Sequence, residues 1–424
     1  MFSAILKRSF TLLVGSGSAA LINLLTIPLL ISHWGMNGYG VYVTLFAVAA
    51  TATAIFSLQP WQTVIRYWYS ADEARQNDLL RQAIILDFFT CTLGSVIFAF
   101  TSDYFLTLVG LPKEYDSALK IQALSIFLSQ AGFPVAYLRI SDKFGAQATA
   151  QYVSAGVRLT SCLIIHFLSP SFLIDIFLLM LPAIVQNLVL WLAALLCLRE
   201  GKHSINFSNK SIDRAFFSYS AWINFKTILD LPINQLDKII ISRYLGVEAT
   251  ALYELLKKLG QIFSMVAQAL SQVSFPVLAK RVSSGEGKTA FRSAIRFARL
   301  GLFATVGATG VLLIVTHLFN VQEISIKGSH LSIAVLCSYV FISLSSNSFI
   351  FVNVLFMSMG YIKKDTFIMI LASSAYLALL AATIQRWQLQ AVMLSLAAQV
   401  VIVVASKLMI ISRSLSFDRP HTLS

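Results

Sequence analysis

The chain has 424 residues, of which 57% are hydrophobic and only 12% are charged, and its mean hydropathy is +0.76. This composition excludes a soluble globular domain and indicates a membrane protein. The formal net charge of +13 does not indicate nucleic-acid binding, because the basic residues are scattered over many loops without an RNA- or DNA-binding motif.

Apolar windows long enough to cross a bilayer recur along the whole chain. About 20 apolar residues span the hydrocarbon core as a helix, so the pattern predicts an all-α integral membrane protein with about 12 transmembrane helices. The predicted spans are Phe10–Ile31, Gly40–Leu58, Ala83–Phe100, Ala118–Leu138, Ala146–Phe167, Phe172–Leu198, Phe216–Leu236, Ala249–Phe275, Ala294–His317, Leu331–Met357, Thr366–Ile384 and Leu389–Ile411.

Charges in the loops orient these spans. The loops on the side of both termini collect about 22 lysines and arginines, against about 6 on the other side, which places both termini in the cytoplasm by the positive-inside rule. The apolar stretch that follows Lys7 and Arg8 is long enough to span, so we interpret it as the first helix and expect no cleaved signal.

Sequence signals of an enzyme are absent. The chain contains no HExxH or CxxC motif, and no loop is long enough for an appended nucleotide-binding or catalytic domain. Cys91, Cys162, Cys197 and Cys337 all fall in apolar segments, where free cysteines serve packing. We therefore expect no catalytic residues, no metal and no cofactor.

An internal repeat divides the chain. The string from Leu29 to Tyr42 returns, with one residue inserted, from Ile239 to Tyr253. Each copy joins the first predicted span of a half to the second, so the repeat predicts two six-helix bundles, 1–210 and 211–424, related by a pseudo-two-fold axis along the membrane normal. Two such bundles would enclose a central cavity, although two short helix connections can also be similar by chance.

Polar residues inside three spans fall on one helical face each. A charge at mid-bilayer costs roughly 2.5 to 3.5 kcal/mol if it faces lipid, so these faces are expected to line a wet interior. We call them the polar stripes. Their members are Gln147, Gln151, Ser154, Arg158 and Ser161; Tyr219, Lys226, Asp230, Asn234 and Asp237; and Glu254, Lys257, Lys258, Gln261, Gln268 and Gln272.

The stripes predict a binding site for an anion. Among the most central charges, the cations Arg158, Lys226, Lys257 and Lys258 stand against the carboxylates of Asp230 and Glu254. Guanidinium and ammonium groups suit phosphate oxygens, while glutamines suit sugars. The carboxylates are candidates for coupling to H⁺ or Na⁺. Alternatively, the pairs Glu254 with Lys258 and Lys226 with Asp230 only neutralise each other. The predicted cavity residues are Arg158, Lys226, Lys257, Lys258, Gln151, Gln261 and Gln268, with Asp230 and Glu254 as possible coupling residues.

Several short motifs carry a family resemblance. They are Ile27-Pro28-Leu29-Leu30, Gly40-Val41-Tyr42, Gln59-Pro60-Trp61-Gln62 with Arg66, Asp237-Lys238 before Leu245-Gly246, and Phe275-Pro276. Through them the chain resembles the O-antigen and polysaccharide repeat-unit flippases of the multidrug/oligosaccharidyl-lipid/polysaccharide (MOP) exporter superfamily.

The resemblance implies a bacterial inner-membrane protein that moves a polyprenyl-diphosphate-linked oligosaccharide from the cytoplasmic to the periplasmic leaflet by alternating access. Membrane lipids, a polysaccharide polymerase and glycan-assembly proteins are the other partners that it implies. The membrane potential can contribute, because exporting two diphosphate charges is favoured by roughly 4 to 5 kcal/mol at about 100 mV.

Two other functions stay open at this point. A multidrug exporter of the same superfamily would share the architecture, but a cavity for cationic drugs should be acidic. A scaffold that does not transport would use the basic loops Arg199 to Arg214 and Lys280 to Arg299 to dock a glycan-assembly partner or anionic lipid.

Overall fold

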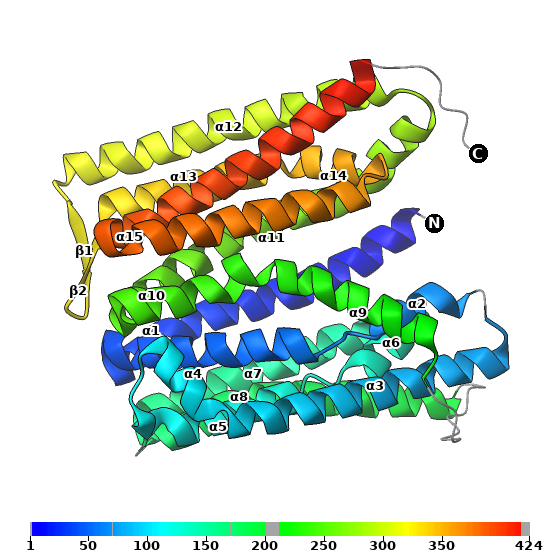
Figure 1. Ribbon diagram of the computed structural model, residues 1–424, viewed down its shortest axis with the longest axis horizontal. Coiled ribbons are helices and arrows are strands. Elements are labelled where there is room, and N and C mark those ends of the chain that lie inside the picture. The colour runs from blue at the N-terminus through cyan, green and yellow to red at the C-terminus, as the bar shows by residue number, and fades with distance from the viewer. Residues whose placement is uncertain (1, 70, 170, 201–211, 417–424) are drawn as a thin grey trace. The chain divides into compact units, whose positions relative to one another are not determined.

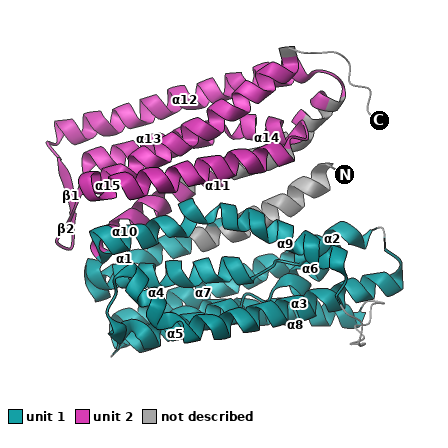
Figure 2. Ribbon diagram, in the orientation of Figure 1, with its two compact units in different colours: residues 1–247 teal, residues 248–424 magenta. Residues whose placement is uncertain are grey.

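The computed structural model describes residues 2–69, 71–169, 171–200 and 212–416, and almost all of them are helical (Figure 1). Contacts within the chain group it into two compact units, residues 1–247 and 248–424 (Figure 2). The predicted boundary between the two bundles, at 210/211, lies outside the described residues. The division into bundles 1–210 and 211–424, which was inferred from the internal repeat, therefore stays a prediction.

Unit 1 is built from long spans joined by short helices. In chain order its elements are α1 (Phe2–Phe56), α2 (Trp61–Trp68), α3 (Glu73–Phe100), α4 (Ser102–Val109), the 3-10 turn η1 (Lys113–Tyr115), α5 (Asp116–Phe127), α6 (Gly132–Ile140), α7 (Phe144–Leu168), α8 (Phe172–Glu200), α9 (Arg214–Leu229), the π-helical turn η2 (Pro232–Leu236) and α10 (Asp237–Leu245).

Unit 2 consists of α11 (Val247–Ser283, nearly all within this unit), α12 (Gly287–Leu318), the hairpin strands β1 (Glu323–Ile326) and β2 (Ser329–Ser332), α13 (Ile333–Ser348), α14 (Ile350–Ser358) and α15 (Ile362–Ser416). The two strands pair antiparallel, with Glu323 opposite Ser332. The hairpin was not predicted, because each strand has only four residues and carries no long apolar pattern.

The predicted all-α membrane fold is confirmed, and each of the 12 predicted spans is mostly helical. Seven stretches of the described residues are long and apolar enough to cross a membrane, and two of them, Leu21–Trp68 and Lys363–Leu415, each hold two predicted spans. The three predicted spans outside these stretches are those that carry the polar stripes, since polar residues lower the hydropathy of a helix.

Sharp corners divide the two longest helices. Gly35 in α1 has φ 69° and ψ −176°, and Gln388 in α15 has φ 47° and ψ −130°. Gly246, between α10 and α11, has φ 89° and ψ 173°. Gly35 and Gly246 are equivalent positions of the internal repeat, so both copies form a helix, a glycine corner and a second helix.

Proline and glycine contribute differently to helix geometry here. Pro28 and Pro182 lie inside continuous helices, whereas Pro232 begins the π-helical turn η2. Gly260 on α11 lies so close to α13 that a Cβ atom would stand 2.6 Å from the Tyr339 hydroxyl. Gly260 therefore permits close helix packing.

Candidate functional site

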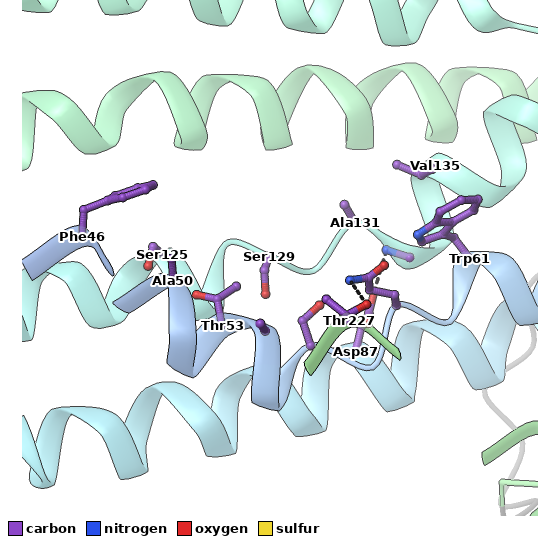
Figure 3. Close-up of a pocket in the computed structure, with 14 residues that line it drawn as sticks. Phe46, Ala50, Thr53, Trp61, Asp87, Ser125, Ser129, Ala131, Val135 and Thr227 are labelled. Atoms are coloured by element: carbon purple, nitrogen blue, oxygen red, sulfur yellow. Dashed lines mark hydrogen bonds between the residues drawn. The ribbon is translucent and has the colours of Figure 1, made fainter. Parts of the chain in front are cut away.

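A cavity of about 470 Å³ lies within unit 1 (Figure 3). Its lining comes from the end of α1, the connection between α1 and α2, and parts of α3, α5, α6 and α9. The 14 lining residues are Phe46, Ala50, Thr53, Ala54, Ser57, Gln59, Trp61, Asp87, Ser125, Ser129, Ala131, Gly132, Val135 and Thr227.

Two interrupted spans meet at this cavity. The helix α1 stops at Phe56 and α2 starts at Trp61, while α5 stops at Phe127 and α6 starts at Gly132. Interrupted backbone within a membrane is tolerated where it lines a cavity or is buried in protein, and where other groups satisfy its freed carbonyls. Both conditions are met here.

Side chains from neighbouring helices satisfy these carbonyls. The Asn224 amide donates to the Ile55 carbonyl over 2.9 Å, and the Trp191 indole donates to the Gln130 carbonyl over 2.9 Å. Across the cavity, the Gln59 amide reaches the Thr227 hydroxyl at 3.5 Å. Neighbouring helices of unit 1 therefore satisfy exposed backbone groups at both interruptions.

Asp87 is the one ionisable residue in the lining of this cavity. It is 3% exposed, and its Oδ2 atom accepts a 2.6 Å hydrogen bond from the Gly132 backbone amide. Its Oδ1 atom is buried and has no hydrogen-bond partner among the described residues. Asp87 was not among the predicted site residues, although a lone carboxylate early in an apolar span is itself a signal of function.

Arg158 on α7 lies against α1 of the same unit. Its guanidinium lies near the phenol groups of Tyr42 and Tyr39 on α1. Its Nε atom is buried without a hydrogen-bond partner, and no described carboxylate forms an ion pair with it. The Nε–H group of Arg158 therefore keeps donor capacity, and a role for Arg158 in binding an anion stays a prediction.

Other polar residues of the α7 stripe contact neighbouring helices. The Ser154 hydroxyl donates to the Pro182 carbonyl of α8 over 2.9 Å. Gln151 has intermediate exposure, and its buried Oε1 atom has no hydrogen-bond partner among the described residues. Part of this stripe thus holds α7 against α8, while Gln151 and Arg158 retain unused hydrogen-bonding groups.

Lys226 and Asp230 on the α9 side of unit 1 form no ion pair with each other in the structure. Lys226 has intermediate exposure, and none of the hydrogen bonds or ion pairs of the described residues involves it. Asp230 is exposed. Mutual neutralisation, the alternative for this pair, is not seen.

The α11 stripe in unit 2 does form a local pair. The Lys258 Nζ atom lies 3.3 Å from Glu254 Oε1 and 3.4 Å from Gln261 Oε1, and Glu254 is buried. Lys257 lies over the Tyr253 ring, with its Nζ atom 5.3 Å from the ring centroid. The side chain of Gln268, also on α11, lies outside the described part of the chain.

Three cations near the ends of predicted spans are buried in helices. Arg81 is 1% exposed, Lys238 is 5% exposed and Lys407 is 5% exposed. The Lys407 Nζ atom lies 2.6 Å from the Asp365 carboxylate and 2.5 Å from the Asn353 amide oxygen. Their burial was not predicted, because each lies near the end of an apolar segment, where the positive-inside rule treats cations as loop residues.

Comparisons with known proteins agree with this architecture. A family model described as "Polysaccharide biosynthesis protein" matches residues 5–282. Among curated proteins, no sequence matches the chain.

Solved structures of two kinds share the fold. A multidrug resistance MATE family transporter of the MOP superfamily, in an inward-facing conformation, matches with a TM-score of 0.72 and 11% identity over 95% of this chain and 96% of that chain. The lipid II flippase MurJ, in an inward closed conformation, matches with a TM-score of 0.70 and 12% identity over 94% of this chain and 87% of that chain. A Vibrio cholerae MATE transporter mutant matches with a TM-score of 0.66 and 12% identity over 98% of this chain and 97% of that chain.

Proposed function

Because the chain belongs to the polysaccharide biosynthesis protein family and has the fold of MOP-superfamily transporters, we propose that it flips a polyprenyl-diphosphate-linked oligosaccharide across a bacterial inner membrane. The family and the fold together identify the chain as a multi-pass membrane transporter of this superfamily. The lipid-linked substrate, its O-antigen or related repeat unit, the export direction and cytoplasmic termini are parts of the proposal.

The observation that carries the proposal is the pair of cations Arg158 and Lys226 on spans of unit 1. Neither forms an ion pair with a described carboxylate. A cation within a membrane span is costly unless it has a partner or meets water, so such residues mark substrate pathways. A diphosphate carries the charge and the oxygen acceptors that these donors lack.

Aromatic and arginine side chains at one end of unit 1 support a sugar-bearing substrate. The guanidinium of Arg66 lies 4.2 Å from the Tyr219 ring centroid, and that of Arg139 lies 4.2 Å from the Trp61 ring centroid. Flat aromatic faces and guanidinium forks suit sugars and phosphates.

The proposal also includes how the transport is driven. Alternating access would move the head group and sugars, and the membrane potential would favour the outward movement of the diphosphate charges. Asp230 and Glu254 remain proposed sites of H⁺ or Na⁺ coupling. A transport rate that does not respond to either ion gradient would remove that role from both.

Complementation tests the function. A flippase-deficient strain that makes the matching glycan would receive the wild type, Arg158→Ala, Lys257→Ala or the control Lys113→Ala, whose lysine is 78% exposed and belongs to none of the polar stripes. We expect the wild type and the control to restore surface polysaccharide at matched protein levels, and Arg158→Ala to lose most of it. No rescue by the wild type would contradict the flippase function and favour drug export or a scaffold.

A further inference from the structure

We propose that Asp87 binds and releases a proton in the cavity of unit 1, and that its protonation state controls the interruption between α5 and α6. Proton binding is a property of unit 1 itself, whereas the use of that proton in transport rests on the proposed function. The reaction is the addition of H⁺ to the Oδ1 atom of the carboxylate, which gives a neutral carboxylic acid, and its reversal.

The geometry of the carboxyl group leaves one oxygen for the proton. Oδ2 is occupied by the Gly132 amide at 2.6 Å, whereas Oδ1 is buried without a hydrogen-bond partner among the described residues. A buried carboxylate is costly unless it is paired or neutralised. No described cation forms an ion pair with Asp87, so a proton is the partner that the site fits.

A metal cation fits this cavity less well. Asp87 is the one charged ligand that the cavity lining offers to a cation, and its Oδ2 atom already accepts from the Gly132 amide. Among the described residues, no cluster of three or more histidines, cysteines, aspartates or glutamates could hold a metal ion. The single unused Oδ1 atom suits one proton.

Several charged groups on the surrounding helices have partners of their own, whereas Lys226 on α9, next to the lining residue Thr227, forms no ion pair with a described carboxylate. Cys91 is the titratable group next to Asp87 on α3. On α5, Lys120 pairs with Asp116, and on α4, Asp103 lies near Lys113. On α2 and α6, Arg66 and Arg139 lie over the aromatic rings of Tyr219 and Trp61. The connection between α1 and α2 contributes Ser57 and Gln59, which do not titrate, to the cavity lining.

The hydrogen bond links the charge of Asp87 to the start of α6. Gly132 is the first residue of α6. The N-cap residue of this helix, Ala131, supplies no side-chain hydrogen bond. A negative charge is stabilising at a helix N-terminus, so ionised Asp87 holds α6 in place, and a proton weakens this attraction. A Cβ at Gly132 would stand 2.3 Å from Asp87 Oδ2 and 2.6 Å from Pro60, so the approach requires glycine.

Carbodiimide labelling tests proton binding directly. N,N′-dicyclohexylcarbodiimide is apolar and adds to protonated carboxyl groups, and mass spectrometry of the full-length protein in nanodiscs locates the adduct. We expect the adduct on Asp87 to fall about tenfold per pH unit on the alkaline side of the titration. Asp87→Asn should lose it, with unchanged elution and thermal unfolding, because the amide oxygen can still accept from Gly132.

Asp175 supplies the matched comparison within unit 1. It is 1% exposed, but its two oxygens accept from Trp34 and Ser169, so it should label far less than Asp87. No Asp87 adduct at any pH, or equal labelling of both residues, would overturn the proposal. Protection by sodium chloride relative to choline chloride at equal ionic strength would also overturn it, because the ligand would then be Na⁺.

A second measurement separates this proposal from the proposed function. In the complementation assay we expect Asp87→Asn to lower surface polysaccharide at least tenfold and Asp87→Glu to retain more. Labelling of Asp87 without rescue by the wild type would leave the proton site standing and contradict the flippase function. Rescue by the wild type without labelling of Asp87 would support the flippase function and overturn the proton site.

Discussion

Gly35 and Gly246 adopt nearly the same backbone conformation, with φ 69° and ψ −176° at Gly35 and φ 89° and ψ 173° at Gly246. This region of backbone space is essentially restricted to glycine. The two copies of the repeat also approach each other, because a Cβ atom on Gly40 would stand 2.0 Å from the Val247 carbonyl oxygen.

The first prediction concerns these corners. Gly35→Ala and Gly246→Ala should each lower the free energy of unfolding by about 1 to 3 kcal/mol, because alanine is strained in this conformation. Gly307→Ala is the control, since this helical glycine is exposed and has nothing within 4 Å of its Cβ position. Thermal unfolding of the purified protein measures all three, and equal stability of the three variants would contradict the prediction.

The second prediction concerns the cavity. Gly132→Ala should destabilise unit 1 by about 1 to 3 kcal/mol, because the added methyl group overlaps Asp87 and Pro60. Gly156→Ala, on α7 with nothing within 4 Å of its Cβ position, should be neutral or slightly stabilising. Thermal unfolding compares the two variants. If Gly132→Ala unfolded with the Gly156→Ala variant or later, the close contact at Asp87 would be wrong.

A third prediction concerns the buried pair in unit 2. Asp365→Asn leaves the Lys407 ammonium buried at 6% side-chain exposure, and should cost about 3 kcal/mol or more. Lys407→Met should cost less, because the Asp365 side chain is 20% exposed and can meet water. Asp103→Asn, in an exposed pair, should change stability by less than about 0.5 kcal/mol. If Lys407→Met lowered the stability more than Asp365→Asn, Asp365 would be the more deeply buried charge.

Acid should weaken the contact between α3 and the start of α9. The Ala215 amide, followed by the Arg75 guanidinium, holds the pKa of Asp213 below its ordinary value. A lowered pKa in the folded state means that Asp213 contributes stability above its unfolded pKa and loses it as the pH falls through its folded pKa. Asp213 is 38% exposed, so the contribution is at most about 1 kcal/mol.

Asp213→Asn isolates this charge, because asparagine keeps the N-cap role. We expect the variant to unfold slightly before the wild type at neutral pH, and the two melting temperatures to converge below about pH 4. A difference that stayed constant across this pH range would assign the effect to packing instead of charge.

Hydropathy and repeats predict most of the fold, for reasons that the structure makes clear. Each long apolar run must satisfy its own backbone in lipid, so it can only be a helix. The repeat aligned Gly35 with Gly246. The structure explains this match, because the backbone conformation at both positions is essentially restricted to glycine. The interruption before Gly132 was missed, since Leu128 to Ala131 are neither charged nor rich in glycine or proline.

The candidate site was less predictable from the sequence. Helical spacing brought Glu254, Lys258 and Gln261 together, as the structure has them. It could not show that Arg158 lies near Tyr42, because that contact joins two distant segments. Asp87 was missed for the same reason: its cavity is formed by α1, α3, α5, α6 and α9 together. The convergence of the three polar stripes remains a prediction.

Direct measurement of substrate flipping tests the central claim. Purified protein would be reconstituted into liposomes with a polyprenyl-diphosphate-linked oligosaccharide, and a membrane-impermeant glycosidase would report the glycan on the outer leaflet. The account predicts that the wild type exposes the inner-leaflet substrate over time, while protein-free liposomes and the Arg158→Ala variant do not. Equal protection of the substrate with and without the wild-type protein, in liposomes where the same protein moves a cationic drug, would contradict it.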